Sequence, residues 1–323
     1  MQLSVIIPNF NGKKLFEKTL PLLLSELQSV ESYEVIIVDD SSTDDSVKYL
    51  KENFKNEIRV LKLKINSGFS KACNIGIETA SGDYVLLINN DVVIKEAFIN
   101  NLLQHFNKQI FAVVPSIKLP GEKCEEEGFT VISFSNGDLS IKMPNEKGLE
   151  FKIKEPTFIP HAVAACAVYD RQKILKLGMF DEMFSPYFWE DVDLSLKALK
   201  LGWKIIYDPS VKVMHKKSKT VKKYYKFTRR FIVNLRNRLL CTWSHLDSDK
   251  LIKKHFIYLT YLYEKGRVLK DKNILIGLNL AFEMLNEIAL KRKRIKHKIS
   301  MEKIIKDYSL DKYEKDFNNN SVL

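Results

Sequence analysis

Cysteine is scarce in this sequence, and its cysteines are far apart. No Cys-x-x-Cys pair occurs among Cys73, Cys124, Cys166 and Cys241. Zinc sites and disulfide frameworks usually show as closely spaced cysteines, so the pattern indicates neither. It fits a reducing, cytoplasmic setting. No basic residue beside Cys166 would activate its thiol, and we interpret this residue as part of the core.

The sequence also lacks a long apolar run and a signal-peptide pattern at its start. The best candidate for a membrane span, residues 274–290, is 17 residues long and contains Glu283 and Glu287, whereas about 20 apolar residues are usual. Its periodicity predicts an amphipathic helix with Leu278, Phe282, Leu285 and Ala289 on one face. The basic stretch KRKRIKHK follows. Docking on anionic lipid and packing against the rest of the protein are both open interpretations.

Charge is unevenly distributed along the chain. The net charge is +12, but residues 216–323 contain 27 Lys and Arg against 11 Asp and Glu, whereas residues 1–215 contain 25 against 29. The basic second part indicates a membrane-surface, polyanion or nucleic-acid partner, with a merely solvated basic face as the plainer alternative. No zinc, helix-turn-helix or RNA-binding motif occurs, so we expect no specific nucleic-acid partner.

Strand and helix patterns alternate in the first part of the chain. We expect strands at residues 3–8, 33–40, 58–63 and 84–88, and helices at residues 13–29 and 69–80. One of the residues 41–43 is expected to cap the helix that follows the second strand. This alternation predicts an α/β fold with a doubly wound, mostly parallel sheet.

The rest of the chain changes character twice. Residues 118–156 predict a hairpin insertion over the site. Helices are expected at residues 171–177 and 192–201, and a strand at residues 203–209 that Pro209 ends. After His215 the chain is expected to be almost entirely helical. We therefore divide it into a domain of residues 1–217 and a basic helical region of residues 218–323.

Residues 82–91, GDYVLLINND, carry the strongest functional signal. The apolar run Tyr84–Ile88 predicts a buried strand, and Asn89, Asn90 and Asp91 follow it. Open α/β sheets bind ligands at this end of their strands, and a carboxylate there can hold a hard cation on a substrate phosphate. From these residues alone, an Asn/Asp turn is an equally good interpretation.

Other polar segments have structural interpretations when each is taken singly. They are IIPNFNG at residues 6–12, VDDSSTDDS at 38–46, the segment 66–91 that begins NSGFSKACN, the segment 187–209 that begins YFWEDVD, and His215. Asp40 can cap a helix and Gly68 can serve a turn. The acids at residues 190–193 can face a helix dipole, and His215 can be a core histidine.

Taken together and in order, these segments resemble the family 2 inverting glycosyltransferases of the polysaccharide and rhamnosyltransferase-like subgroup. The resemblance runs from Val5 to His215, and a weaker likeness continues through Arg236-Asn237 to Lys291–Arg294. It implies the GT-A fold and a nucleotide-diphosphate sugar as donor. The second part of the chain would then be a helical C-terminal extension.

The resemblance also implies roles for individual residues. The expected nucleotide-binding residues are Pro8, Asn9, Asp40, Asn66, Gly68, Asn74, Asn89 and Asn90. Asp91, the last acid of the family's D-x-D motif, and His215 would hold Mg²⁺ or Mn²⁺ on the diphosphate. Asn89 replaces the first acid of that motif, which predicts a lower metal affinity because an amide carries no charge.

Asp191 matches the family's catalytic base, which removes the proton of the acceptor hydroxyl. Glu190 and Trp189 are expected on the acceptor side, by orienting the acceptor or stacking on a sugar, with core packing as the alternative for Trp189. Where relatives often have a Ser-Gly-Ala stretch, this chain has Ala-Ala-Cys-Ala at residues 164–167. The residues stay small, but a hydroxyl that could touch the acceptor is missing.

These observations predict a metal-dependent glycosyltransferase of the EC 2.4 class. It would move a sugar, from a UDP- or dTDP-sugar first of all, to a glycan or lipid-linked acceptor in polysaccharide biosynthesis at the cell envelope. We expect a cytoplasmic protein, peripheral on the inner face of the membrane or dimeric through its C-terminal helices. The alternatives are a sugar-1-phosphate nucleotidyltransferase, which PNFNGKK matches poorly, and a non-catalytic polyanion-binding scaffold.

Overall fold

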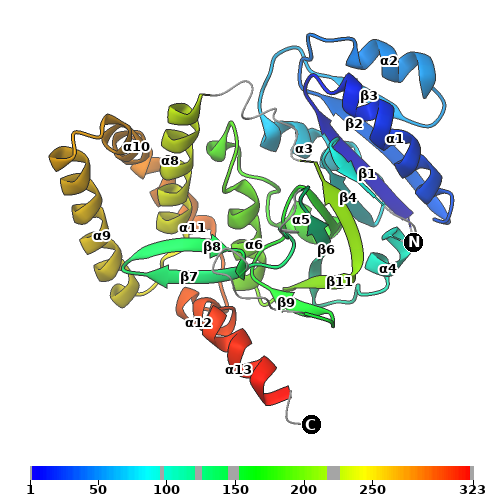
Figure 1. The fold of residues 1–323 in the computed structure, drawn as a ribbon. Helices are drawn as coiled ribbons and strands as arrows, with labels where there is room; N and C mark the ends of the chain where they lie inside the picture. The colour runs from blue at the N-terminus through cyan, green and yellow to red at the C-terminus, as the bar shows by residue number, and fades with distance from the viewer. Residues whose placement is uncertain (1, 95–97, 121–125, 145–152, 217–225, 321–323) are drawn as a thin grey trace.

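A computed structural model describes residues 2–94, 98–120, 126–144, 153–216 and 226–320 (Figure 1). Its centre is a nine-stranded sheet in the order β3-β2-β1-β4-β10-β6-β11-β5, with β9 paired to β11. The strands of this sheet are β1 (Gln2–Asn9), β2 (Ser32–Asp39), β3 (Arg59–Lys62), β4 (Tyr84–Ile88), β5 (Val92–Val93), β6 (Ile110–Lys118), β9 (Thr157–Ile159), β10 (Cys166–Asp170) and β11 (Lys204–His215). Strands β3, β2, β1 and β4 are parallel, whereas β10 runs antiparallel to β4 and β6. The predicted mostly parallel α/β sheet is confirmed.

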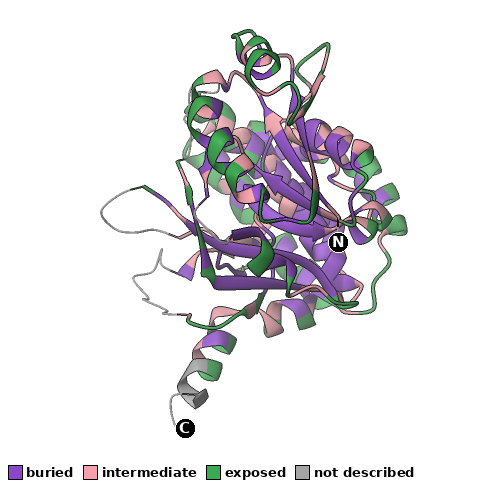
Figure 2. Cartoon of the chain, turned by 90° about the vertical axis from the view of Figure 1, so that its right-hand side faces the viewer, coloured by how far each residue is buried: buried purple, intermediate pink, exposed green. Residues whose placement is uncertain are grey.

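The helices of the first part cover this sheet, whose strands are largely buried (Figure 2). They are α1 (Lys13–Leu27), α2 (Ser46–Asn53), α3 (Phe69–Thr79), α4 (Phe98–Leu103), α5 (Arg171–Lys176), the 3₁₀ turn η2 (Glu182–Phe184) and α6 (Glu190–Lys200). One expectation was wrong: Asp45, not a residue of 41–43, precedes α2. Ser42 instead accepts hydrogen bonds from the Asn11 backbone and the Asn9 side chain, at 2.8 and 3.2 Å.

Two further predictions need correction. The hairpin is present as β7 (Val131–Ser135) and β8 (Asp138–Lys142), with Asn136 and Gly137 in left-handed conformation at φ 52° and 84°. Its tip lies against helix α9, where the Gly137 carbonyl and His255 Nδ1 are 2.7 Å apart, whereas Glu127, which precedes the two strands in the predicted insertion, contacts His215 of β11. Strand β11 also continues through Pro209 to His215, because the ladder to β6 is interrupted between Asp208 and Lys212.

The C-terminal region is helical, as predicted. Its helices are α8 (Phe227–His245), α9 (Asp249–Val268), α10 (Lys272–Phe282), α11 (Leu285–Arg294), α12 (Met301–Asp307) and α13 (Leu310–Asn320). The expected helix over residues 274–290 is split, since α10 and α11 meet at a bend of 52°. Among the described residues, no single helix is long and apolar enough to span a membrane, and this bent pair passes that test on length and composition only.

The predicted amphipathic face divides between core and surface. Leu278 of α10 is buried, and α10 packs against α8. Phe282 and Leu285 are 44% and 46% exposed, and Ala289 is exposed as well. The C-terminal helices share one hydrophobic core with the first part of the chain. The predicted boundary between residues 217 and 218 lies outside the described residues.

A buried ion cluster fastens the C-terminal helices to α6. Asp193 of α6 has no exposed surface and lies 2.8 Å from Lys197 Nζ, 2.7 Å from Lys291 Nζ of α11 and 2.9 Å from His245 Nε2 of α8. Burial would raise the pKa of Asp193, but the two ammonium groups hold it well below its usual range. Lys291 also pairs with Asp181 at 2.9 Å. One carboxylate thus joins three helices.

We expect Asp193→Asn to lower the free energy of unfolding by about 3–5 kcal/mol, because it leaves the ammonium groups of Lys197 and Lys291 without their shared, fully buried counter-charge. Urea denaturation measures this. Asp307→Asn is the matched control, since Asp307 pairs with Lys303 at 2.9 Å on the surface, where a lost ion pair costs about 1 kcal/mol or less. Equal losses in the two variants would contradict the role given to the cluster.

Candidate active site

The ends of β1 and β2 are joined by a buried polar network. Asn9 and Asp39 are register partners, and Asn9 Nδ2 donates to Asp39 Oδ2 at 2.8 Å. Asn90, which follows β4, donates from Nδ2 to Asn9 Oδ1 at 2.8 Å. A Cβ at Gly12 would lie 2.2 Å from both amides, so only glycine fits beneath them. The side chains of Asn9 and Asn90 therefore bind each other and shape the strand ends.

Asp40 organises the neighbouring loop. Its carboxylate accepts hydrogen bonds from the backbone N–H groups of Ser67 and Gly68, at 2.7 and 2.9 Å. Asn66 donates to the Asp40 carbonyl at 3.1 Å. Burial raises the pKa of Asp40, against the lowering effect of these backbone donors. Each carboxylate oxygen has a further lone pair, so Asp40 can still accept an N–H from a base.

The remaining predicted nucleotide residues differ in accessibility. Pro8 is half-buried in β1 beside Val38 of β2. Gly68 has φ 91° and lies close to Pro186, a conformation that only glycine adopts without strain. Asn74 binds the backbone of Phe180 with both ends of its amide, at 2.8 and 3.0 Å. Its geometry fixes α3 against the segment that leads to α6.

Asp91 and His215 meet at the end of β4, although they are far apart in sequence. His215 Nε2 lies 3.2 Å from Asp91 Oδ1, because β11 ends beside β5, where His215 pairs with Val92. His215 Nδ1 lies 2.9 Å from Glu127 Oε2. Burial lowers the pKa of His215, but the two carboxylates raise it to about 9. Glu127 was not expected at the site, because nothing in the sequence GEKCEEEGF distinguishes one glutamate from the next.

These residues fit a divalent cation. A carboxylate oxygen and an imidazole nitrogen face one another, and a second carboxylate holds the far side of the imidazole, as is usual for metal-bound histidine. Asn89 follows β4 and is partly exposed. The donors Asp91 and His215 suit Mg²⁺ or Mn²⁺.

Asp191 lies in the first turn of α6, where several donors converge on its carboxylate. It accepts hydrogen bonds from the backbone N–H groups of Ala164 and Val192, at 3.2 and 2.9 Å, and His161 Nε2 lies 3.1 Å away. Burial raises the pKa of Asp191, but His161 and the backbone donors outweigh it and lower the pKa below its usual value. His161 was missed because a lone histidine in IPHAVAAC has no motif spacing.

Glu190 has the opposite electrostatic character. It is 6% exposed, and burial together with the charge of Asp191 raises its pKa well above the usual value. Among the described residues, nothing donates a hydrogen bond to its Oε2. The pKa values of these two adjacent carboxyl groups are thus shifted in opposite directions, an arrangement typical of acid–base sites.

Helix α8 holds the loop that precedes this pair. Asn237 donates from Nδ2 to the carbonyls of Phe184, Tyr187 and Phe188, at 2.6, 2.9 and 2.9 Å. Arg236 binds the Ser185 carbonyl.

Trp189 is held by the same helix, because its indole N–H donates to Asn234 at 2.8 Å. Phe188 and Trp189 have φ 75° and 76°. Residues of the C-terminal region therefore fix the strained backbone that leads into Glu190 and Asp191.

The small residues 164–167 connect the two halves of the site. The Asn89 N–H donates to the Ala165 carbonyl at 2.9 Å, and the Ala164 N–H donates to Asp191. Ala164 and Ala165 are 3% and 9% exposed, so larger side chains would separate these segments. Cys166 is fully buried and its pKa is raised by burial, in keeping with its interpretation as a core residue.

A second group of potential ligands lies deeper. Donor atoms of Asp193, Cys241 and His245 are within 4.8 Å of one another, the spacing of a metal site. Lys197 and Lys291 already neutralise Asp193, however, and burial raises the pKa of the Cys241 thiol. This donor set fits a metal ion poorly, because the two ammonium groups already supply the positive charge that the metal ion would bring.

Comparison with known proteins identifies the family. The sequence profile described as "Glycosyl transferase family 2" matches residues 4–178. The chain is 31% identical over 116 residues to "Glycosyltransferase GlyG" of Streptococcus pneumoniae serotype 4, which is 35% of this chain and 37% of that protein. It is 36% identical over 95 residues to the "Poly(ribitol-phosphate) beta-glucosyltransferase" of Bacillus spizizenii, 28% of this chain and 15% of that protein. The matches thus span well under half of either relative.

The structure is similar to that of GalNAc-T7, solved with UDP, GalNAc and Mn²⁺. The TM-score is 0.60 at 18% sequence identity, over 77% of this chain and 49% of the other. This likeness confirms the predicted GT-A fold. Because the family profile covers more than half of the chain, this protein belongs to the family 2 glycosyltransferases, as its motifs predicted.

Proposed function

We propose that this enzyme transfers a sugar, with inversion, from a nucleotide-diphosphate donor to a hydroxyl of a glycan or lipid-linked acceptor. The observation that carries the proposal is the pairing of two sites across residues 164–165: Asp91 with His215 on one side, and the ionised carboxylate of Asp191 on the other. A UDP- or dTDP-sugar is the expected donor.

On the donor side, Asp40 accepts an N–H of the base, and the loop at Asn66 and Gly68 flanks the nucleotide. Asp91 and His215 would hold Mg²⁺ or Mn²⁺, and the bound cation would supply positive charge against the negative charge of the diphosphate leaving group. The Mn²⁺ and UDP bound to GalNAc-T7, which has the same fold, support this assignment.

On the acceptor side, Asp191 removes the proton of the attacking hydroxyl as the new glycosidic bond forms. Its lowered pKa keeps it ionised at neutral pH. Glu190, with its raised pKa, is protonated and donates a hydrogen bond that orients the acceptor. Trp189, held by Asn234, borders this side. Attack opposite the leaving diphosphate gives the inverted product.

The acceptor belongs to polysaccharide biosynthesis at the cell envelope. This proposal is supported by one of the two relatives, whose name is poly(ribitol-phosphate) beta-glucosyltransferase. A sugar-1-phosphate nucleotidyltransferase is not favoured, since the family match and these names concern glycosyl transfer. A scaffold without catalysis would not need the converging donors at Asp191.

We place the protein in the cytoplasm, peripheral on the inner face of the membrane, with the C-terminal region as its contact. Phe256, Ile257, Val268 and Leu269 of this region are 65–69% exposed. Residues 249–298 contain 13 Lys and Arg against five Asp and Glu. Two such faces would repel each other in a dimer, whereas anionic lipid would attract them. Co-flotation with phosphatidylglycerol vesicles tests this proposal. A protein that is dimeric and does not float with the vesicles would refute it.

Nucleotide binding tests the donor site. We expect calorimetry with UDP, dTDP, GDP and CDP to show tight binding of one nucleotide only with Mn²⁺, and Asp91→Ala to weaken it by about tenfold or more because the cation loses a charged ligand. Asp83→Ala is the control, since Asp83 precedes the same strand at its other end. Failure of every nucleotide to bind would refute the proposal and favour the scaffold.

The contact between His161 and Asp191 predicts a change in pH dependence. His161 lowers the pKa of Asp191, so His161→Gln lets that pKa rise, and the base is then protonated at higher pH. We expect the acid limb of the kcat/KM profile to move up by about one pH unit. His105→Gln is the control, because His105 pairs with Asp208 elsewhere. An unchanged profile would show that His161 does not act on the base.

A further inference from the structure

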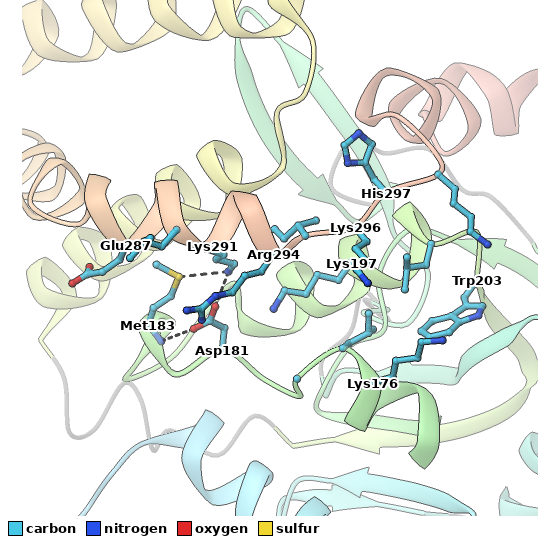
Figure 3. A pocket seen from close by; sticks show the side chains of 16 residues that line it. Lys176, Asp181, Met183, Lys197, Trp203, Glu287, Lys291, Arg294, Lys296 and His297 are labelled. Carbon is cyan, nitrogen blue, oxygen red and sulfur yellow. Dashed lines mark hydrogen bonds and ion pairs between the residues drawn. The ribbon is translucent and has the colours of Figure 1, made fainter.

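A basic pocket lies at the opposite end of α6 from Asp191. Its volume is about 890 Å³, and it opens between α11 with residues 295–298 on one side and the ends of α5 and α6 with Trp203 on the other (Figure 3). This size is typical of pockets that hold a discrete small ligand or a segment of a larger one. None of the residues assigned to donor or base lines it.

The pocket carries an excess of positive charge. Its Lys and Arg residues are Lys176, Lys197, Lys291, Arg294, Lys296 and Lys298, against the acids Asp181 and Glu287. Lys197 and Lys291 are neutralised by Asp193 and Asp181. The other four form no ion pair within the described part of the chain. Like charges that line one cavity repel each other, and a bound anion would relieve that repulsion.

The walls of the pocket are fixed by buried contacts. Lys291 is 9% exposed, and its two ion pairs hold α11 against α6 and η2. The Lys298 and Ile299 N–H groups donate to the Lys200 carbonyl at 2.7 and 3.1 Å, which fastens the segment after α11 to the end of α6. The cations at residues 294–298 therefore project from an ordered frame, unlike those of a solvated tail.

One wall is aromatic. Trp203 is stacked on Phe111 with an angle of 5° between the rings, and Lys176 Nζ lies 5.7 Å from the indole centroid. Trp203 is partly exposed and lines the pocket. A fixed indole face beside cations offers apolar contact to a sugar ring and charge to a phosphate on that sugar.

We propose that this pocket binds a phosphate-bearing glycan. Its concave shape suits a chain segment better than a flat membrane surface. Residues 191 and 201 are separated by ten residues of helix, about 15 Å at 1.5 Å per residue, so one extended chain could reach both the pocket and the base. That the glycan is the acceptor rests on the proposed function, whereas its binding here does not.

Binding to phosphorylated dextran tests the proposal, with unmodified dextran and inorganic polyphosphate as comparison ligands. We expect the triple variant Lys176→Glu, Lys296→Glu, Lys298→Glu to weaken binding of phosphorylated dextran by about tenfold or more in calorimetry. The triple variant Lys18→Glu, Lys51→Glu, Lys55→Glu has the same net charge, changes exposed lysines outside the pocket and should bind as wild type does. Trp203→Phe should weaken the binding of phosphorylated dextran more than the binding of polyphosphate.

Three results would overturn the proposal. The wild type could fail to bind phosphorylated dextran, or both triple variants could bind it equally weakly. Alternatively, the pocket variant could lose binding to phosphatidylglycerol vesicles while it still binds phosphorylated dextran. The last result would assign the pocket to lipid headgroups. Binding of UDP, dTDP, GDP and CDP with Mn²⁺, measured in the same samples, separates this test from the proposed function. Failure of all four nucleotides to bind to every protein, with phosphorylated dextran still bound, would refute the donor site alone.

Discussion

Asp193 has no exposed surface, and Lys197, Lys291 and His245 all contact its carboxylate. Burial lowers the pKa of His245 to about 4, so this histidine is neutral and the two lysines balance the charge. A buried carboxylate is stable only with such partners, and they come from α6, α8 and α11. The C-terminal helices are therefore held in one place against α6, and both ends of that helix depend on them.

At its first turn, α6 carries Glu190 and Asp191, and the loop before it is held by Asn237 of α8. The backbone of residues 164–165 then links Asp191 to the strand that leads to Asp91. At its other end, α6 supplies a wall of the basic pocket, to which α11 is fixed by Lys291. The basic C-terminal region thus holds the loop before Glu190 and Asp191 in place, and it also forms one wall of the basic pocket.

Local patterns predicted the features that depend on neighbouring residues. The strand at residues 84–88 and the helices near residues 13–29 and 69–80 followed from apolar periodicity. The strand that was expected to end at Pro209 does not end there, because an interrupted ladder lets β11 continue past the proline. His161 and Glu127 were missed as partners of the site, since they act through contacts across 30 and 88 residues of sequence. Asn237 was part of the weaker likeness, but nothing in the sequence showed that it binds several carbonyls of the loop before α6. Such contacts leave no spacing in the sequence.

The most direct test of the account is the activity of Asp191→Asn. This change removes the base but keeps the shape of the side chain, and general-base catalysis contributes about 10²–10⁴-fold to rate. The account predicts that transfer from the nucleotide sugar falls by about that factor, while metal-dependent binding of the nucleotide is unchanged. Full transfer activity in the variant would contradict the assignment of Asp191 as the catalytic base, and with it the interpretation of α6 as the helix that carries the base.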